Sequence, residues 1–194
     1  MDQAASVCPT CARLRPCYRA LRSWSLFDAP VRPALHRLKY RRNVGLGEAL
    51  APQLCDFVVG LGWTVRCVVP VPLADKRLAE RGYNQAGLIA RPLAMALRVA
   101  YSPKAVARIR DTRSQVGLTA AARRANVQGA FEADPRLVDD RTILLVDDVA
   151  TTGATLSSCA EALYASGAQD VFALTVARAY PRFSGGGTAA GPPR

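Results

Sequence analysis

Three continuous apolar segments constrain the fold of this chain more than any other feature. They are residues 66–71, 142–146 and 170–177, with the sequences RCVVPV, TILLV and DVFALTVA. Short segments that are apolar at almost every position are typical of strands buried on both faces, as in a parallel sheet covered by helices on either side. The sequence therefore predicts an α/β fold with a parallel sheet between two helical layers.

Amphipathic helices are predicted in the segments around these strands. Apolar residues recur at helical spacing in residues 31–40, 48–61, 84–97, 120–126 and 156–166. The turn that ends at Asn84 marks the start of the third helix, Thr119 suits the N-cap of the fourth, and Gly167 is placed to end the fifth. Residues 108–118 are polar and are predicted to form a loop.

The length of 194 residues, half of them apolar, suits one domain with small appendages. We expect residues 1–23 to form a cysteine-bearing appendage, residues 24–179 the main domain, and residues 180–194 a disordered tail rich in glycine and proline. No segment reaches the roughly 18 apolar residues of a membrane span, and the first residues lack the apolar run of an export signal. A cytoplasmic protein is therefore expected, with its six cysteines outside disulfides.

The net charge of +11 favours anionic partners such as nucleic acid or phosphorylated small molecules. Basic residues are concentrated in residues 1–46 and 75–124, whereas most of the charged residues in the segment 126–170 are acidic. A genome rich in arginine codons and an ordinary solvated surface would produce a similar composition. Charge alone therefore leaves contact with nucleic acid open.

The most informative segment begins in the second apolar strand and reads ILLVDDVATTGAT over residues 143–155. Small and hydroxyl-bearing residues let backbone N–H groups approach an anion, and Gly153 admits backbone angles that other residues avoid. The helix that follows points its unpaired N–H groups at the same place. Asp147 and Asp148 suit vicinal hydroxyls or a cation, so the segment predicts a ribose 5-phosphate ligand. The alternative is an ordinary strand end with a threonine-rich helix cap.

Residues 143–155 resemble the phosphoribosyl-pyrophosphate signature of type I phosphoribosyltransferases. From about Cys8 to Arg178 the chain resembles the ComF family, the competence-associated phosphoribosyltransferase-like proteins. Further matching stretches are Leu38-Lys39-Tyr40, residues 69–73, Arg77, residues 81–85, residues 110–115, and Arg123, Arg124 and Asn126. The resemblance implies a type I phosphoribosyltransferase fold, phosphoribosyl pyrophosphate as ligand, Mg²⁺ bridging its pyrophosphate and ribose hydroxyls, and a role in DNA uptake with single-stranded DNA and a competence helicase as partners.

The resemblance also implies a set of site residues. We expect Asp147, Asp148 and Arg77 to be catalytic. Arg77, together with Lys76, would supply the positive charge that stabilises the pyrophosphate leaving group. Besides the acidic pair, the predicted ligand-binding residues are Ala150, Thr151, Thr152, Gly153, Ala154 and Thr155, then Pro72, Leu73, Lys76 and Arg77 from the loop after the first strand, and Arg110 and Gln115 from a loop that closes over the ligand. The alternatives for these two loops are a solvated basic turn and an ordinary surface loop.

Three cysteines near the N-terminus raise the question of a metal. Cys8 and Cys11 have the two-residue spacing of a zinc knuckle. The ComF resemblance implies a module with two such pairs, but only one is present; Cys17 and His36 are candidate further ligands at non-standard spacing. The sequence leaves two interpretations open, a partial Zn²⁺ site and a free pair of cysteines.

Two functions compete. The first is a phosphoribosyltransferase-like protein of DNA uptake that binds phosphoribosyl pyrophosphate and Mg²⁺. The second is a glycosyltransferase of nucleotide metabolism that salvages a nucleobase, which requires a base pocket and turnover; the sequence identifies no acceptor. A phospho-acceptor regulatory domain is disfavoured because its acidic pair usually comes early in the chain. A P-loop ATPase is disfavoured because no Gly-x-x-x-x-Gly-Lys segment occurs.

Overall fold

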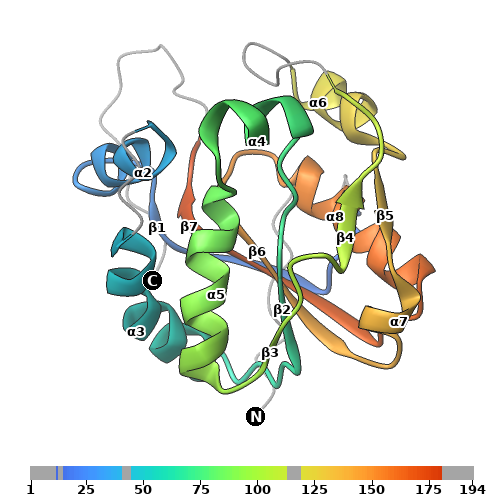
Figure 1. The fold of residues 1–194 in the computed structure, drawn as a ribbon, viewed down its shortest axis with the longest axis horizontal. Helices are drawn as coiled ribbons and strands as arrows, with labels where there is room; N and C mark the ends of the chain where they lie inside the picture. The colour runs from blue at the N-terminus through green and yellow to red at the C-terminus, as the bar shows by residue number, and fades with distance from the viewer. Residues whose placement is uncertain (1–11, 13–14, 41–44, 113–118, 181–194) are drawn as a thin grey trace.

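A five-stranded parallel sheet forms the centre of the computed structural model, which describes residues 12, 15–40, 45–112 and 119–180 (Figure 1). The strand order is β1-β7-β6-β2-β3, and all neighbouring pairs are parallel. The strands are β1 (Ala20–Leu26), β2 (Cys67–Pro70), β3 (Ala100–Tyr101), β6 (Thr142–Ala150) and β7 (Asp170–Arg178). The three predicted strands are confirmed as β2, β6 and β7, but β6 continues four residues past its predicted end at Val146, because it stays paired with β7.

Helices cover both faces of this sheet, as predicted (Figure 1). One face packs against α2 (Val31–Tyr40), α3 (Gly45–Gly60) and α5 (Gln85–Leu97), and the other against α8 (Ala154–Ala165). Within β6, Ile143 and Leu145 belong to the α8 side, whereas Leu144 and Val146 belong to the α5 side. Both sets are fully buried, which is why the strand is apolar at every one of these positions.

A small second sheet lies over the α8 side. It pairs β4 (Val106–Arg108) antiparallel with β5 (Phe131–Ala133), and α6 (Ala120–Val127) and α7 (Pro135–Val138) flank it. We call these four elements the hood. Thr119 caps α6 as predicted, since its hydroxyl oxygen accepts from the Ala122 N–H at 3.2 Å. The predicted polar loop starts inside β4, and residues 113–118 lie outside the described residues.

The other predicted helix boundaries are also explained by their caps. The Asn84 side chain accepts from the Ala86 N–H and so starts α5, while its amide donates to the Val71 carbonyl at 2.9 Å. Gly167 has φ +94, and its N–H bonds to the Tyr164 carbonyl just past the end of α8. Two helices were not predicted: the four-residue α7, and α4 (Asp75–Arg81), which occupies much of the expected pyrophosphate loop and buries none of its residues.

Strand β1 was not predicted either. It pairs with β7 at the sheet edge, and the expected boundary between residues 23 and 24 falls within it. Its residues are exposed or only partly buried, so its sequence lacks the apolar run that identified the other strands. Tyr180 is the only described residue of the predicted tail. In the described ranges, no helix is long and apolar enough to cross a membrane.

The close approach of α3 to α5 depends on Gly47. A Cβ atom at this position would lie 2.0 Å from the Leu88 carbonyl oxygen, whereas at Gly60, in the same helix, it would meet nothing within 4 Å. We expect Gly47→Ala to lower the free energy of unfolding by about 2 kcal/mol or more, because the two backbones must separate. The matched control Gly60→Ala should stay within about 1 kcal/mol of the parent. Urea denaturation measures both, and equal stabilities would contradict the packing described.

Candidate functional site

The two predicted ligand loops follow neighbouring strands. Pro70 at the end of β2 lies opposite Val146 in β6, and β6 continues to Ala150. The segments that follow these two strands therefore both begin at the carboxyl ends of the strands, which we call the carboxyl edge of the sheet. From β2 the chain continues to β3 on one side, and from β6 it continues to β7 on the other. Ligands of open α/β sheets bind outside the carboxyl ends of the strands at such a reversal. The fold therefore brings residues 72–77 and 151–155 to the place where a ligand crevice is expected.

Residues 151–155, which we call the threonine loop, connect β6 to α8. Gly153 occupies the N-cap of α8 with φ +78, a conformation that other residues adopt only with strain. A Cβ atom on Gly153 would also lie 2.7 Å from the Tyr18 hydroxyl oxygen. The Thr152 hydroxyl accepts from the Ala154 N–H at 3.3 Å, a long bond within the loop itself. Thr151 is exposed, and Thr152 and Thr155 are partly exposed, so the loop presents hydroxyl groups at the start of a helix of 12 residues.

The acidic pair is divided between the two faces of β6. The Asp148 carboxylate is 4% exposed, and its Oδ2 lies 2.6 Å from Lys39 Nζ of α2, on the α5 side. Asp147 points toward the α8 side, where its charge acts on the buried Cys159 thiol, and it keeps partial exposure. This division follows from the alternation of side chains along a strand. The expectation that both carboxylates hold one diol stays a prediction, and Asp147 is the more accessible of the two.

The pKa values of two groups on the α8 side, Asp147 and Cys159, are shifted. Burial raises the pKa of its carboxyl well above the ordinary value, and the neighbouring charge of Asp148 raises it further. Burial likewise raises the pKa of the Cys159 thiol, with Asp147 as a second cause. A negative charge on Asp147 is therefore costly in the folded protein as it stands, and a cation or a hydrogen-bond donor beside it would lower that cost.

The predicted basic residues come from α4 and from the segment after β4. Lys76 and Arg77 are exposed on α4, while Pro72 and Leu73 before it are partly buried. Burial lowers the pKa of Arg108 in β4, and the charge of Arg77 lowers it further. Arg110 is exposed, but its Nη2 donates to the Asn126 and Gln128 carbonyls, so it fastens the end of α6 in the hood.

Two contacts that were not predicted hold the threonine loop and the first turn of α8. Arg123 of α6 donates from Nη1 to the Thr151 hydroxyl at 2.8 Å, so the hood rests directly on the loop. On the other side, the Cys17 N–H donates to the Ser157 hydroxyl at 3.0 Å, next to Tyr18. Arg123 belongs to a stretch matched by the family resemblance, which is the one signal in the sequence that pointed to it.

The predicted zinc ligands are only partly described. Cys8 and Cys11, like Gln115, lie outside the described residues. Cys17 is exposed with a free thiol, and His36 is exposed on α2 with its ring 4.7 Å from that of Tyr40. The described part of the chain contains no group of three His, Cys, Asp or Glu side chains able to hold a metal. A Zn²⁺ site stays a prediction.

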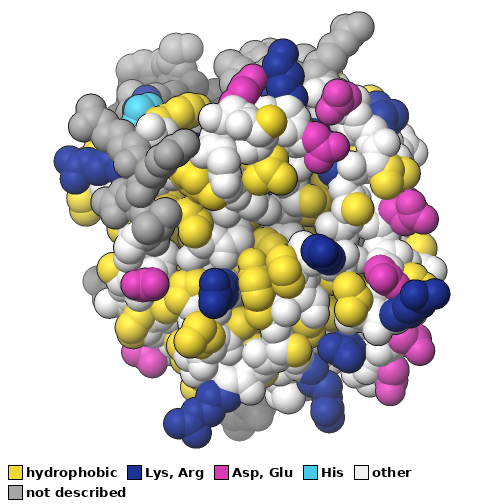
Figure 2. Space-filling view, viewed as in Figure 1, with side chains coloured by type: hydrophobic (Ala, Val, Ile, Leu, Met, Phe, Trp, Pro, Cys, Tyr) yellow, Lys and Arg dark blue, Asp and Glu magenta, His cyan; other side chains and the backbone are white. Residues whose placement is uncertain are grey.

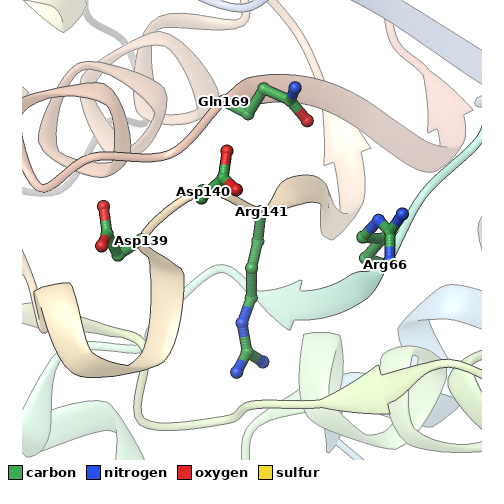
Figure 3. Close-up of a pocket in the computed structure, with 5 residues that line it drawn as sticks. All are labelled: Arg66, Asp139, Asp140, Arg141 and Gln169. Atoms are coloured by element: carbon green, nitrogen blue, oxygen red, sulfur yellow. The ribbon is translucent and has the colours of Figure 1, made fainter.

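A cavity of about 570 Å³ lies at the opposite edge of the sheet (Figure 3). Arg66 and Arg141, just before β2 and β6, line it together with Asp139, Asp140 and Gln169. Figure 3 shows these side chains around the amino ends of the strands, where both signs of charge are mixed. The cavity is therefore separate from the edge that carries the acidic pair and the threonine loop.

Comparison with known proteins identifies the family. The model of the phosphoribosyl transferase domain matches residues 65–181. DNA utilization protein YhgH of Salmonella typhi is 34% identical over 170 residues, which cover 84% of this chain and 74% of that protein. Competence protein F of Haemophilus influenzae is 30% identical over 182 residues, covering 90% and 80%. Among solved structures, the glutamine phosphoribosylpyrophosphate amidotransferase of B. subtilis aligns with 73% of this chain and 26% of its own at 20% identity, with a TM-score of 0.46.

The matched domain spans β2 to β7 and includes the α4–α5 turn, and the similarity to Competence protein F covers 90% of this chain. The chain belongs to the ComF family of phosphoribosyltransferase-like proteins.

Proposed function

We propose that this protein binds phosphoribosyl pyrophosphate with Mg²⁺ at the carboxyl edge of β2 and β6, and that it acts in DNA uptake. The observation that carries the ligand is the position of the threonine loop, with Gly153 at positive φ, at the point where the strand order reverses. The role in DNA uptake is supported by relatives named for competence and for DNA utilization.

The roles of the residues follow from their chemistry. The hydroxyl groups of Thr151, Thr152 and Thr155 and the N-terminus of α8 would hold the 5-phosphate. Asp147 would accept hydrogen bonds from the ribose hydroxyls, because it is the partly exposed carboxylate. Lys76 and Arg77 on the first turn of α4 would offset the charge of the pyrophosphate.

The acidic pair also suits Mg²⁺. This ion prefers oxygen ligands, usually one or two carboxylates together with phosphates of the substrate. Burial, and after it the neighbouring charge of Asp148, raises the pKa of Asp147, so a negative charge there is costly, and a divalent cation would lower that cost. Asp147 would hold the ion, with Asp148 next to it on β6. When bound, Mg²⁺ would supply charge neutralisation of the ligand's phosphates.

The ligand is tested by calorimetric titration with phosphoribosyl pyrophosphate and Mg²⁺. Asp147→Asn should weaken binding by about 2 kcal/mol, or about 30-fold in Kd, because it removes charged hydrogen bonds. The control is Asp140→Asn, which changes an exposed aspartate of the other Asp-Asp pair at the opposite edge of the sheet and should leave Kd unchanged. Absence of binding by the parent protein would contradict the proposal. Pyrophosphate release with a panel of nucleobases would instead favour salvage.

The stability of the same variant separates damage to the site from damage to the fold. A carboxyl group with a raised pKa in the folded state contributes a loss of stability that grows as pH rises from its ordinary pKa, near 4, toward the raised value. Asp147→Asn removes this titration. We therefore expect the variant to gain stability relative to the parent between about pH 4 and pH 7, with the gain vanishing at acid pH. Urea denaturation over this range checks it, and a variant that is less stable at pH 7 would contradict it.

Contact with DNA requires a separate test. On the face shown in Figure 2, basic side chains are dispersed among acidic and hydrophobic ones. We expect binding of a labelled single-stranded oligonucleotide, followed by fluorescence anisotropy, to weaken more than tenfold between about 50 and 200 mM salt. Arg124→Glu, at an exposed position of α6, should weaken it further, whereas Arg136→Glu, in the exposed start of α7, should not. Affinity that is independent of salt would count against the proposed contact.

A further inference from the structure

The last turn of α2 is fastened to the turn between α4 and α5. The Tyr83 hydroxyl donates to the Leu38 carbonyl at 2.6 Å. The Arg81 guanidinium lies 5.2 Å from the centre of the Tyr40 ring, and it donates to Gln85 Oε1 at 3.0 Å, at the start of α5. Two motifs that are far apart in the sequence and had no assigned role, Leu38-Lys39-Tyr40 and residues 81–85, therefore form one contact.

Lys39 lies between the two anchored residues of α2, and its side chain reaches β6. Its Nζ is 2.6 Å from Asp148 Oδ2, and the two side chains are 26% and 5% exposed. Asp148 Oδ2 makes no hydrogen bond within the described part of the chain, so the ammonium group is its charge partner there. The other basic residues of α2, Arg32 and Arg37, are exposed. Lys39 is thus the basic residue of this helix that is directed into the site.

A buried carboxylate requires a partner of opposite charge, because its desolvation is otherwise uncompensated. Holding a long lysine side chain in one conformation costs rotamer entropy, and the fixed helix end reduces the freedom that remains to be lost. The ammonium group is a compact charge, as a metal ion is, and it stays in place when no metal is bound. The ammonium group therefore stays at the carboxyl edge of β6, where it offsets the charge of Asp148, whether or not a metal is bound.

We infer that Lys39 is a positioning residue of the phosphoribosyl site: it holds Asp148 at the carboxyl edge of β6 and serves there as a resident cation beside the one that Mg²⁺ brings. This inference rests on the proposed function, since it concerns the same site. It assigns a task to each part of the contact. Tyr40 and the Leu38 carbonyl fix the helix end, and Lys39 carries the charge.

The test measures the affinity for phosphoribosyl pyrophosphate by calorimetry over a series of Mg²⁺ concentrations. Lys39→Met should bind about tenfold more weakly than the parent at low Mg²⁺. This loss should shrink as Mg²⁺ is raised, because a second divalent ion can then occupy the position beside Asp148. Lys39→Arg, which keeps the charge, should retain most of the affinity. The matched control is Arg37→Met, an exposed residue of the same helix, which should bind as the parent does.

A second pair of variants tests whether Lys39 acts through Asp148. In an Asp148→Asn background, adding Lys39→Met should weaken binding less than it does in the parent, since the partner carboxylate is already gone. A merely structural role would give a loss that does not depend on Mg²⁺ or on the residue at position 148. The double variant replaces both members of the ion pair, so neither is left buried without its partner. It can therefore be compared with Asp148→Asn even if Lys39→Met does not fold.

The outcomes are distinguishable. If the parent binds the ligand and Lys39→Met binds equally well at every Mg²⁺ concentration, the inference on Lys39 is overturned while the proposed function stands. If adding Lys39→Met weakens the Asp148→Asn variant as much as it weakens the parent, the inference is also overturned. If the parent itself fails to bind at any Mg²⁺ concentration, the proposed function is wrong, and the inference that rests on it is rejected with it.

Discussion

The site depends on strand β6 being longer than its neighbour β2. The register pairs the end of β2, Pro70, with Val146, whereas β6 remains paired with β7 as far as Ala150. The acidic pair therefore lies past the end of β2. In this part of β6, regular strand pairing exists on one side only, with β7. A functional group on a strand is positioned more precisely than one on a loop. Register between three strands, rather than the conformation of a loop, decides where Asp147 and Asp148 stand.

The same strand gives two adjacent carboxylates different tasks. Alternation directs Asp148 to Lys39 on one side of the sheet and Asp147 toward Cys159 on the other. Lys39 offsets the charge of Asp148, whereas a negative charge on Asp147 stays costly, as the raised pKa of its carboxyl shows. A buried charge without a partner lowers the stability of the fold. Destabilising features of this kind are expected mainly at functional sites, where a ligand can supply the missing opposite charge. This asymmetry is the reason why the proposed function assigns the ligand contact to Asp147 rather than to Asp148.

How much of this could be predicted from the sequence depends on how local each feature is. The apolar strands, helix α2 and the threonine loop are contiguous signals, and their positions were predicted closely. Strand β1 was missed because its sequence, ALRSWSL, is ordered by pairing with β7 at the other end of the chain. Helix α4 was missed because it buries no residue, and the pairing of β4 with β5 involves only short segments. The contacts of Lys39 with Asp148 and of Arg123 with Thr151 join distant residues, so no spacing in the sequence indicates them.

The residues before β1 extend the same logic to the threonine loop. Gly153 is constrained twice, by its positive φ and by the Tyr18 hydroxyl that occupies the space of a side chain. Cys17 bonds to Ser157 in the first turn of α8, and β1 begins shortly afterwards at Ala20 along β7. Because α6 reaches the loop from the other side through Arg123, the loop is held between the hood and the segment that leads into β1. Its shape is therefore set by the assembled fold, so the helix N-terminus and its exposed threonine would need little rearrangement to receive the phosphate that the proposed function places there.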